Sequence, residues 1–485
     1  KSRGARMKKL AILSLIGLVL ASGCKVSEVG SPESTIQLPD QYDGVENDTT
    51  LSIAQLKWEN YFSDPRLKNL ISKALTHNQD NLIALERIKS NRATMQAAKA
   101  ALFPAISGRA GASQRRFGEY TMDGIGNYDT NLSENLSEDK RIPDPYTDFI
   151  VGADFEWELD IWGKLRNKKR AALARYIASE EMSKAVQTWL ISEVASNYYQ
   201  LLAIDTEIQT LTQNIELQEL AHNLITELKE GGKTNQLAVD QFEALVLNTK
   251  AQREAKIREQ KTTEYNLTRL VGTLDIPTER TDLDSAVERP RVREIGLPAQ
   301  MIQFRPDIQE AELRLQASKF DVRAAKAAFF PSVNLFGMAG FNAFDFGKLF
   351  FNPASTMYQV GAGLTAPIFN RREIQAAYQI ANADQQIALL EYEKRTLNAY
   401  LEVLDLINQI NTLENQLKLK QYEVAVQQRS VENSNTLFSV GFANYLEVIN
   451  AQSRALESAM ELADLKASRL KANVQLYRAL GGGWN

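Results

Sequence analysis

Hydrophobic and polar residues alternate strictly in two short stretches of the chain. Across residues 148–160 the apolar positions share one side, and mainly acidic residues and glycine occupy the other, with Ile150 as the exception. Residues 357–368 repeat the alternation. A period of two with one apolar face predicts β-strands. Weaker alternation at 105–115 and 332–342 predicts two more. The sequence therefore indicates four strands, each long enough to cross a membrane at a tilt.

Helical periodicity covers most of the remaining chain. Two very long helices are expected near 163–230 and 370–439, and at 1.5 Å per residue each would reach roughly 100 Å. Shorter helices are expected at 66–101, 234–272, 306–328 and 443–480. Val194, Leu201, Ile208 and Ile215 step by seven, and Leu397, Leu401, Leu404, Leu413 and Leu417 keep a similar spacing. These spacings are typical of coiled coils.

The chain contains one unit twice. The sequence AKAALFPAI at 98–106 matches AKAAFFPSV at 325–333, and 230–239 matches 439–448. Each copy is expected to run helix, strand, loop, strand, very long helix, tight turn, helix. The first copy carries extra polar residues at 114–147. The resulting domains are a signal peptide at 1–23, an N-terminal segment at 24–62, repeat 1 at 63–272, an inter-repeat segment at 273–300 and repeat 2 at 301–482.

Carboxylates on the strand at 148–160 distinguish a pore from a packed sandwich. Asp148, Asp154, Glu156 and Glu158 lie on its polar side. They would be costly in a dry core but cost little when they face a water-filled lumen. Four strands cannot close a barrel, two chains give a barrel filled by side chains, and three chains give twelve strands with an open lumen. A homotrimer is therefore expected, with these four residues facing its lumen.

The N-terminal residues resemble a secretory signal. Met7 is followed by two lysines, an apolar run at 10–20 and the sequence LASGC, which ends at Cys24. This is the pattern of a bacterial lipoprotein signal, so we expect Cys24 to be lipidated and to anchor the chain in outer-membrane lipid. Cys24 is the only cysteine, which excludes an intrachain disulfide. Residues 1–6 are interpreted as an upstream extension.

Composition and motifs argue against other classes of protein. The net charge of −4 shows no basic excess, so no nucleic-acid partner is expected. The two histidines, His77 and His222, lie far apart, and no phosphate-binding loop is present. We therefore expect no catalytic residues, no cofactor, no metal site and no enzymatic activity. A structural coiled-coil rod would fit the helices, but the amphipathic strands and the lipoprotein signal argue against it.

Four stretches resemble one known family. They are Glu156 to Lys164, Leu297-Pro298 with Arg305-Pro306-Asp307-Ile308 and the helix to Pro331, Ala366 to Phe369, and Gly441 to Val448. Together they resemble the TolC/OprM-type outer-membrane factors, in their lipoprotein branch. The resemblance implies an α+β membrane protein. Its trimeric 12-stranded transmembrane β-barrel, with four strands per chain, continues into a long periplasmic α-helical coiled-coil barrel. A mixed equatorial region would form from about 38–62, 273–300 and the end near Trp484.

The resemblance also implies a function and partners. Such a protein is the passive outer-membrane exit duct of a tripartite efflux pump, which conducts drugs or other small molecules from a periplasmic adaptor and an inner-membrane transporter of the RND type. Type I protein secretion and metal-cation efflux are the alternatives. The adaptor would contact the hairpin tips. The residues implied there are Gly231, Gly232, Lys233, Asn235, Gly441 and Asn444.

Two departures from the family pattern concern turns. The family usually has glycine soon after Pro-Ile-Phe, where this chain has Asn370, Arg371 and Arg372. Many members carry aspartate near the second hairpin turn, which gives an acidic ring at the periplasmic entrance, and this chain lacks it there. Phe438 and Phe442 suggest an apolar entrance constriction instead. Ordinary coiled-coil packing is the alternative for both phenylalanines.

Overall fold

A computed structural model describes residues 34–42, 52–275, 279–286, 295–367, 369 and 372–484. The signal peptide, Cys24, Asn370 and Arg371 lie outside these residues. Two compact units can be distinguished. The first contains 95–172 and 316–387, and the second contains 34–94, 173–315 and 388 onwards. None of the described helices is long and apolar enough to cross a membrane.

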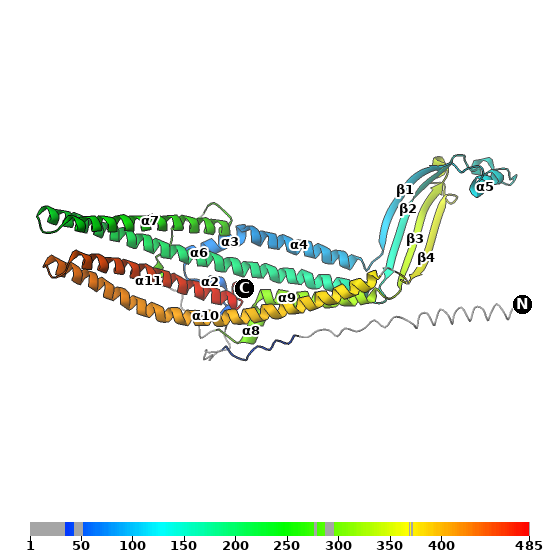
Figure 1. Cartoon of the computed structure of the whole chain (residues 1–485). Coiled ribbons are helices and arrows are strands. Elements are labelled where there is room, and N and C mark those ends of the chain that lie inside the picture. Colours follow the sequence, from blue (N-terminus) through cyan, green and yellow to red (C-terminus); the bar gives the residue numbers. More distant parts are fainter. Residues whose placement is uncertain are drawn as a thin grey trace. The chain divides into compact units, whose positions relative to one another are not determined.

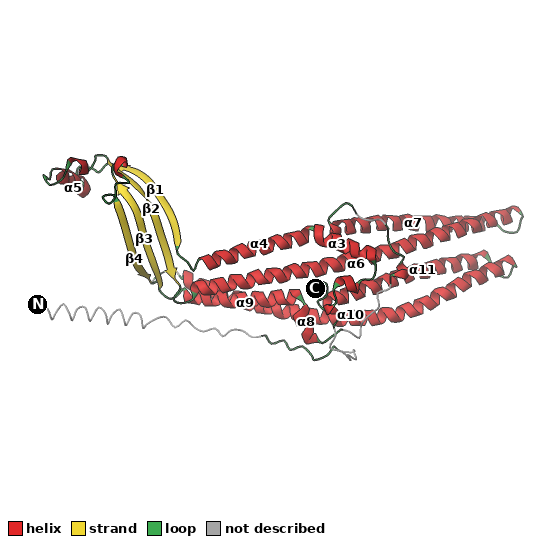
Figure 2. Ribbon diagram, turned by 180° about the vertical axis from the view of Figure 1, so that it is seen from behind, coloured by secondary structure: helices red, strands yellow, loops and turns green. Residues whose placement is uncertain are grey.

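The first unit contains a single antiparallel sheet. Its strands are β1 (Ala105–Arg115), β2 (Tyr146–Leu159), β3 (Ser332–Ala343) and β4 (Thr356–Thr365). They lie side by side in chain order (Figure 2). All four predicted strands are confirmed, with bounds that differ by at most three residues. Within the described chain, β1 and β4 each pair on one side only.

The polar segment between β1 and β2 contains structure that the sequence did not predict. It forms α5 (Met122–Asn131) and a 3₁₀ turn at Glu138–Lys140. The side chain of Thr121 caps α5 by accepting a hydrogen bond from the backbone N–H of Gly124 at 3.1 Å. Gly124 and Gly126 lower helix propensity, which hides this helix in the sequence. The β3–β4 connection contains a 3₁₀ turn of the same length, η5, at Phe346–Lys348.

The long helices follow the predicted repeat closely. α6 (Lys164–Glu230) and α10 (Glu373–Ser439) each have 67 residues. They turn back into α7 (Gln236–Val271) and α11 (Tyr445–Ala479), and the hairpins lie alongside each other (Figure 1). Shorter elements complete the fold. They are η1 (Ile53–Gln55), α2 (Trp58–Tyr61), α3 (Pro65–His77), α4 (Gln79–Ala100), η3 (Leu283–Ser285), α8 (Pro298–Phe304) and α9 (Pro306–Ala327).

The prediction of one continuous helix at 66–101 is wrong, because the helix breaks at Asn78. The Asn78 side chain accepts a hydrogen bond from the N–H of Asn81 at 3.0 Å and donates to the carbonyl of Leu270 at 2.9 Å. α7 ends against this break at Gly272, whose φ is +77°. A Cβ at Gly272 would lie 2.5 Å from the carbonyl oxygen of His77. Only glycine allows this close approach.

The second copy has the same packing arrangement. α11 is followed by Gly481, whose φ is +98° and whose Cβ would lie 2.5 Å from the carbonyl of Phe304. Phe304 ends α8, and α9 begins two residues later. In each copy the end of the returning helix therefore packs against a break between two short helices. Gly272 and Gly481 stand 209 residues apart, which is the offset of the hairpins in the sequence.

The predicted coiled-coil seam of α6 is largely buried. Val194, Leu201 and Ile215 are at most 4% exposed, and Ile208 is partly exposed. In the single chain, the first half of the predicted seam of α10 is not covered, because Leu397 and Leu401 are 46% and 50% exposed. The buried row of α10 runs instead through Ala399, Val403, Leu406, Ile410, Leu413 and Leu417. Two adjacent apolar rows with similar spacing cover α10, and the spacing alone does not distinguish them.

Candidate functional site

One face of the sheet is apolar from edge to edge. The strand register places the apolar residues of β2 beside those of β3 and, through β3, beside those of β4. The face consists of Ile106, Gly108, Ala110 and Ala112 of β1, Phe149, Val151, Ala153, Phe155, Trp157 and Leu159 of β2, Val333, Leu335, Gly337, Ala339 and Phe341 of β3, and Tyr358, Val360, Ala362 and Leu364 of β4. Tyr358 and Val360 are 83% and 77% exposed. No described element covers them.

The other face collects the polar residues, including the four predicted carboxylates. Asp148, Asp154, Glu156 and Glu158 all belong to it, because they alternate with the apolar positions of β2. Glycine, serine, asparagine, glutamine and threonine supply much of the rest from β1, β3 and β4. The sheet is thus amphipathic as a whole, as expected for a sheet with lipid on one side and water on the other.

Basic side chains, which the sequence analysis did not predict, neutralise part of the negative charge of this face. Arg109 of β1 lies 3.2 Å from the Asp154 carboxylate, and Lys164 lies 2.5 Å from that of Glu158. The amide of Asn342 donates to Asp148 at 2.7 Å. Glu156 is exposed. The pairing of Arg109 with Asp154 depends on the β1–β2 register, which the sequence does not show.

Aromatic residues of the Glu156–Lys164 motif fasten the junction between strands and helices. The indole N–H of Trp157 donates to the carbonyl of Leu102 at 3.0 Å. That of Trp162 donates to the carbonyl of Pro331 at 2.7 Å, and its ring stacks on Phe330 with centroids 4.9 Å apart. The motif of the first copy therefore holds the equivalent junction of the second copy.

The two junctions share one backbone conformation. Gly163, before α6, has φ +79°, and Arg372, before α10, has φ +65°. Their carbonyls accept the first hydrogen bonds of the two helices, from Asn167 and Ala376. Arg372 therefore adopts the left-handed conformation that glycine takes in the first copy. This gives a structural meaning to the departure from the family pattern at this position.

The two hairpin tips end their first helix in the same way. Gly232 (φ +69°) and Gly441 (φ +80°) are left-handed, and a Cβ on either would meet no atom within 4 Å. After each, the next N–H reaches back five residues, from Lys233 to Leu228 and from Phe442 to Leu437. These are Schellman motifs, which explain both glycines without any partner.

The asparagines at the tips cap the returning helices. Asn235 accepts from the N–H of Ala238 at 3.1 Å, and Asn444 accepts from that of Glu447 at 3.2 Å. The exposed residues at the tips include Gly231, Gly232, Lys233 and Gly441, so these positions form the accessible surface of the tips. A contact with an adaptor there stays a prediction.

The two phenylalanines of the predicted constriction differ in their surroundings. Phe438 packs against a small core of Ile225, Ala238, Val239, Phe242 and Val448, which joins the two hairpins near their tips. Packing is thus a sufficient reason for Phe438. Phe442 is 84% exposed and touches no such core. The predicted apolar constriction therefore depends on Phe442.

A buried ionic cluster holds the break between α8 and α9. Arg305 of the Arg-Pro-Asp-Ile motif is 6% exposed and binds Asp307 at 2.8 Å, Glu402 at 2.7 Å and the carbonyl of Ala479 at 2.9 Å. Arg478 also binds Glu402. Burial alone would raise the pKa of Asp307, but the hydrogen bonds and charge of Arg305 outweigh it and lower this pKa. The motif is therefore explained by structure.

The geometry and the repeat agree with one family. A family model for outer membrane efflux proteins matches residues 70–273 and 297–482, which are the two copies of the repeat. The chain belongs to the outer membrane efflux protein family. Its resemblance to the outer-membrane factors is thereby confirmed.

Three relatives in this family match over most of their length. Solvent efflux pump outer membrane protein SrpC of Pseudomonas putida is 30% identical, covering 98% of this chain and 99% of SrpC. Probable outer membrane lipoprotein SilC of Salmonella typhimurium is 27% identical, covering 99% and 100%. Cation efflux system protein CusC of Escherichia coli is 29% identical, covering 88% of both chains.

A solved structure of CusC, reported with conformational changes that accompany folding and transmembrane channel formation, is similar throughout. It matches with a TM-score of 0.79 at 27% identity, covering 94% of this chain and 99% of that chain. The fold class, the role in outer-membrane efflux and the outer-membrane location predicted from the sequence are confirmed. The family and its solved relatives are channel proteins.

Proposed function

We propose that three copies of this chain form the exit duct of a tripartite efflux pump and that the polar sheet face lines its lumen. The observation that carries the proposal is the amphipathic four-stranded sheet, in which β1 and β4 each pair on one side only among the described residues. An open edge in lipid would leave backbone groups unpaired, and pairing β1 with β4 of a neighbour removes both edges. Three chains supply twelve strands, enough for a water-filled lumen.

Exposed leucines on the helices support assembly of the same chains outside the sheet. Leu397 and Leu401 of α10 lie outside the core of the single chain. In a helical barrel of three chains, this row would pack against a neighbouring chain, because removing its apolar surface from water is favourable in free energy. Purified protein should therefore migrate as a heat-modifiable trimer. A stable detergent-solubilised monomer would contradict the proposal.

The lumen should prefer cations mildly. The polar face carries Asp148, Asp154, Glu156 and Glu158 against Arg109 and Arg115, so it retains negative charge in each chain. Such rings of carboxylates attract cations. Reconstituted in planar bilayers, channels should show a small cation preference that decreases in Glu156→Gln. Clear anion selectivity would refute this lining.

The tips and the N-terminus supply the remaining contacts. The exposed surface at Gly231, Gly232, Lys233, Asn235, Gly441 and Asn444 would meet a periplasmic adaptor, which links the duct to an inner-membrane transporter of the RND type. Phe442 would narrow the entrance. Cys24 would carry the lipid, in agreement with the name of the lipoprotein SilC. Labelled palmitate should be incorporated into the wild-type chain and not into Cys24→Ser.

Small molecules are the proposed cargo, and the chain itself catalyses nothing. SrpC and CusC are named for solvent efflux and cation efflux, which favours small solutes over secreted proteins. Deleting the gene in its host should raise the intracellular accumulation of a dye substrate, and the wild-type chain should restore its export. Unchanged accumulation of dyes, solvents and metal ions, together with a loss of a secreted protein, would favour type I secretion instead.

A further inference from the structure

A phenylalanine lies on the polar face of the sheet. Phe336 of β3 stands directly opposite Glu156 of β2 and Gly361 of β4 in the strand register. Because opposite residues of antiparallel strands project to the same side of a sheet, Phe336 shares the face of Glu156. Its side chain is 41% exposed. In a membrane sheet such a residue is expected on the face that meets lipid, so its place among polar residues needs an explanation.

Glycines on β4 give the Phe336 ring its room. A Cβ built at Gly361 would lie 2.6 Å from the ring, and one built at Gly363 would lie 3.7 Å from it. The ring therefore lies over the backbone of β4, at a position where only glycine leaves space for it. Phe155 lies over Gly337 in the same way on the apolar face. The sheet thus holds two aromatic rings over glycines, on opposite faces.

A carboxylate without an ion pair lies beside the ring on the polar face. Directly opposite residues have Cβ atoms about 4.5–5.5 Å apart, so Glu156 is within reach of a ligand on the ring. Glu156 is exposed, and it takes part in no ion pair among the described residues. The flanking carboxylates of β2 are neutralised. Asp154 is paired with Arg109, and Glu158 with Lys164. The charge of Glu156 therefore stays available.

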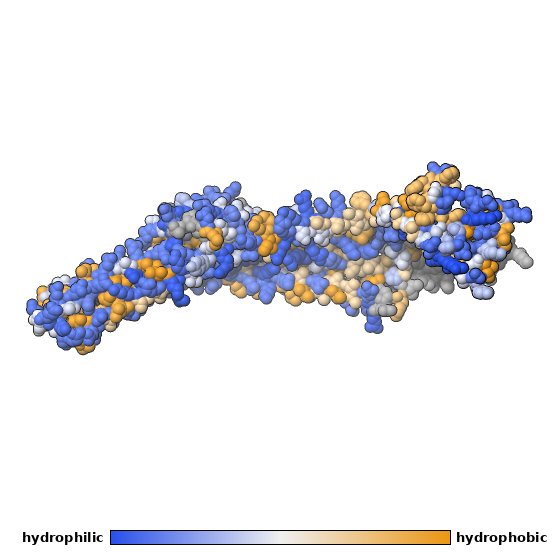
Figure 3. All heavy atoms as spheres, turned by 90° about the horizontal axis from the view of Figure 1, so that it is seen from above, coloured by the Kyte–Doolittle hydropathy of each residue, from blue (hydrophilic) through white to orange (hydrophobic). Residues whose placement is uncertain are grey.

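Apolar surface extends from the ring along β3. Met338 lies two residues from Phe336 on the same face, opposite Gln359 of β4. Exposed apolar side chains also occur elsewhere on the molecule, as the orange regions of the space-filling view show (Figure 3). This position differs because an aromatic ring and an unpaired carboxylate lie together. An aromatic face attracts an organic cation, and a carboxylate beside it adds the opposite charge.

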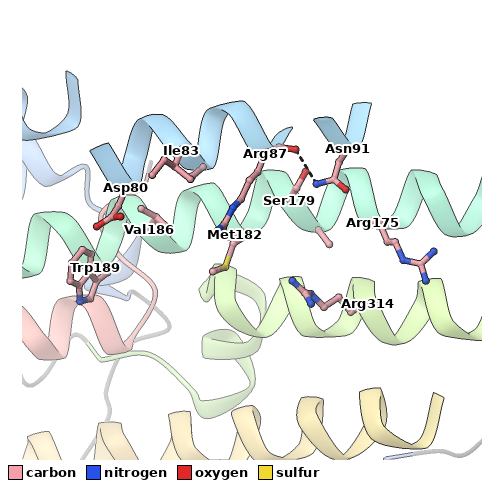
Figure 4. A pocket seen from close by; sticks show the side chains of 12 residues that line it. Asp80, Ile83, Arg87, Asn91, Arg175, Ser179, Met182, Val186, Trp189 and Arg314 are labelled. Carbon is pink, nitrogen blue, oxygen red and sulfur yellow. Dashed lines mark hydrogen bonds between the residues drawn. The ribbon is translucent and has the colours of Figure 1, made fainter. Parts of the chain in front are cut away.

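The cavity among α4, α6 and α9 has a mixed lining instead (Figure 4). It measures about 550 Å³, and Asp80, Arg87 and Arg314 are among its lining residues. Arg314 already binds the carboxylate of Glu310. Carboxylate and guanidinium groups are therefore mixed around this cavity, and they favour no single ligand charge. The polar face of the sheet has the clearer chemical preference.

We propose that Phe336 and Glu156 form a binding site for organic cations on the wall of the duct. The cation lies over the Phe336 ring, with the Glu156 carboxylate beside it and Met338 against its apolar part. The inference rests on the proposed function, because it is in the trimeric duct that this face meets water. Threefold symmetry places three such sites at one level of the lumen. Binding is weak because ring and carboxylate are exposed, which allows a solute in transit to leave again.

Ethidium, a planar aromatic cation, is the probe for this site. The purified full-length protein is placed in phosphatidylcholine nanodiscs, and the fluorescence anisotropy of ethidium is followed as protein is added, with empty nanodiscs as background. We expect saturable binding that benzyltrimethylammonium displaces. Tetramethylammonium, which lacks the ring, should displace ethidium less well. Benzenesulfonate, which has a ring and the opposite charge, should leave it bound.

Variants on the two faces separate the site from the stability of the sheet. Phe336→Leu should weaken ethidium binding about fivefold, as expected when an exposed cation–π contact is lost. Glu156→Gln should weaken it about threefold, as for an exposed ion pair. Phe336→Tyr keeps the ring and should bind as the wild type does. Phe155→Leu is the matched control, because it uncovers Gly337 on the apolar face, and it should also bind as the wild type does.

Trimer migration in an unheated gel, recorded for each sample, distinguishes failure of the site from failure of the duct. Three results with a trimeric protein would overturn the site alone: no saturable binding of ethidium, displacement by benzenesulfonate as good as by benzyltrimethylammonium, or equal loss of binding in Phe336→Leu and Phe155→Leu. Wild-type affinity in the Phe336→Leu, Glu156→Gln double variant would overturn it as well. A wild-type protein that forms no trimer would contradict the duct and this inference together.

Discussion

The packing at the repeated helix breaks predicts that two left-handed glycines, Gly481 and Gly441, respond differently to substitution by alanine. Gly481 (φ +98°) packs against Phe304, whereas Gly441 (φ +80°) is left-handed in open space. Alanine at either position meets the strain of a left-handed residue, which costs about 1–2 kcal/mol. At Gly481 the new Cβ would also lie 2.5 Å from backbone atoms of Phe304. Backbone shifts forced by such overpacking cost about 1–3 kcal/mol more.

The comparison between the two variants isolates the close approach. Gly481→Ala should therefore lose about 2–5 kcal/mol and Gly441→Ala about 1–2 kcal/mol. The change in the unfolded chain is the same for both and cancels. The first copy offers an independent pair, because Gly272 meets His77 at 2.5 Å and Gly232 meets nothing. Gly272→Ala should likewise cost more than Gly232→Ala.

Thermal unfolding of the purified protein, followed by differential scanning fluorimetry, measures the order of the four variants. The expected result is a larger fall in the unfolding midpoint for Gly272→Ala and Gly481→Ala than for Gly232→Ala and Gly441→Ala. Equal falls within each pair would refute the account. They would mean that the helix ends do not rely on close backbone packing at the breaks.

Three further predictions concern individual residues. Arg372→Gly should raise the stability by about 1 kcal/mol, because it relieves a left-handed arginine, and a lower unfolding midpoint would contradict this. Arg305→Met should cost about 3–5 kcal/mol, because Asp307 and Glu402 would lose a buried partner, and a loss below about 1 kcal/mol in chemical denaturation would refute it. Because the pKa of Asp307 is lowered in the folded chain, its ionised carboxylate stabilises the wild type above the usual aspartate range. This stabilisation is lost as the pH falls through the lowered pKa of the folded chain. Asp307→Asn should therefore flatten the acid limb of the stability curve, and an unchanged limb would argue against this coupling.

Regular periodicity made the strands and long helices readable from the sequence. Residues 148–160 alternate throughout except at Ile150, and the long helices carry many turns of apolar spacing. The break at Asn78 was not readable, because Gly272, almost 200 residues away, makes its packing possible. The row of α10 that is buried within the chain was not predicted, because Leu397 and Leu401 form a second apolar row beside it.

The candidate site was readable only in part. The carboxylates of β2 could be assigned to one face, since alternation alone decides this. The pairing of Arg109 with Asp154 required the register of two strands.

Accessibility of alternating positions on β2 tests the central claim most directly. The chain has one native cysteine, Cys24, which lipidation would block, so introduced cysteines can be followed singly. In intact outer membranes, a water-soluble thiol reagent should label Asp154→Cys and Glu156→Cys through the lumen. It should not label Ala153→Cys and Phe155→Cys, which face lipid in this account. Equal labelling of both sets, or labelling of the apolar set alone, would contradict a duct lined by the polar face of the sheet.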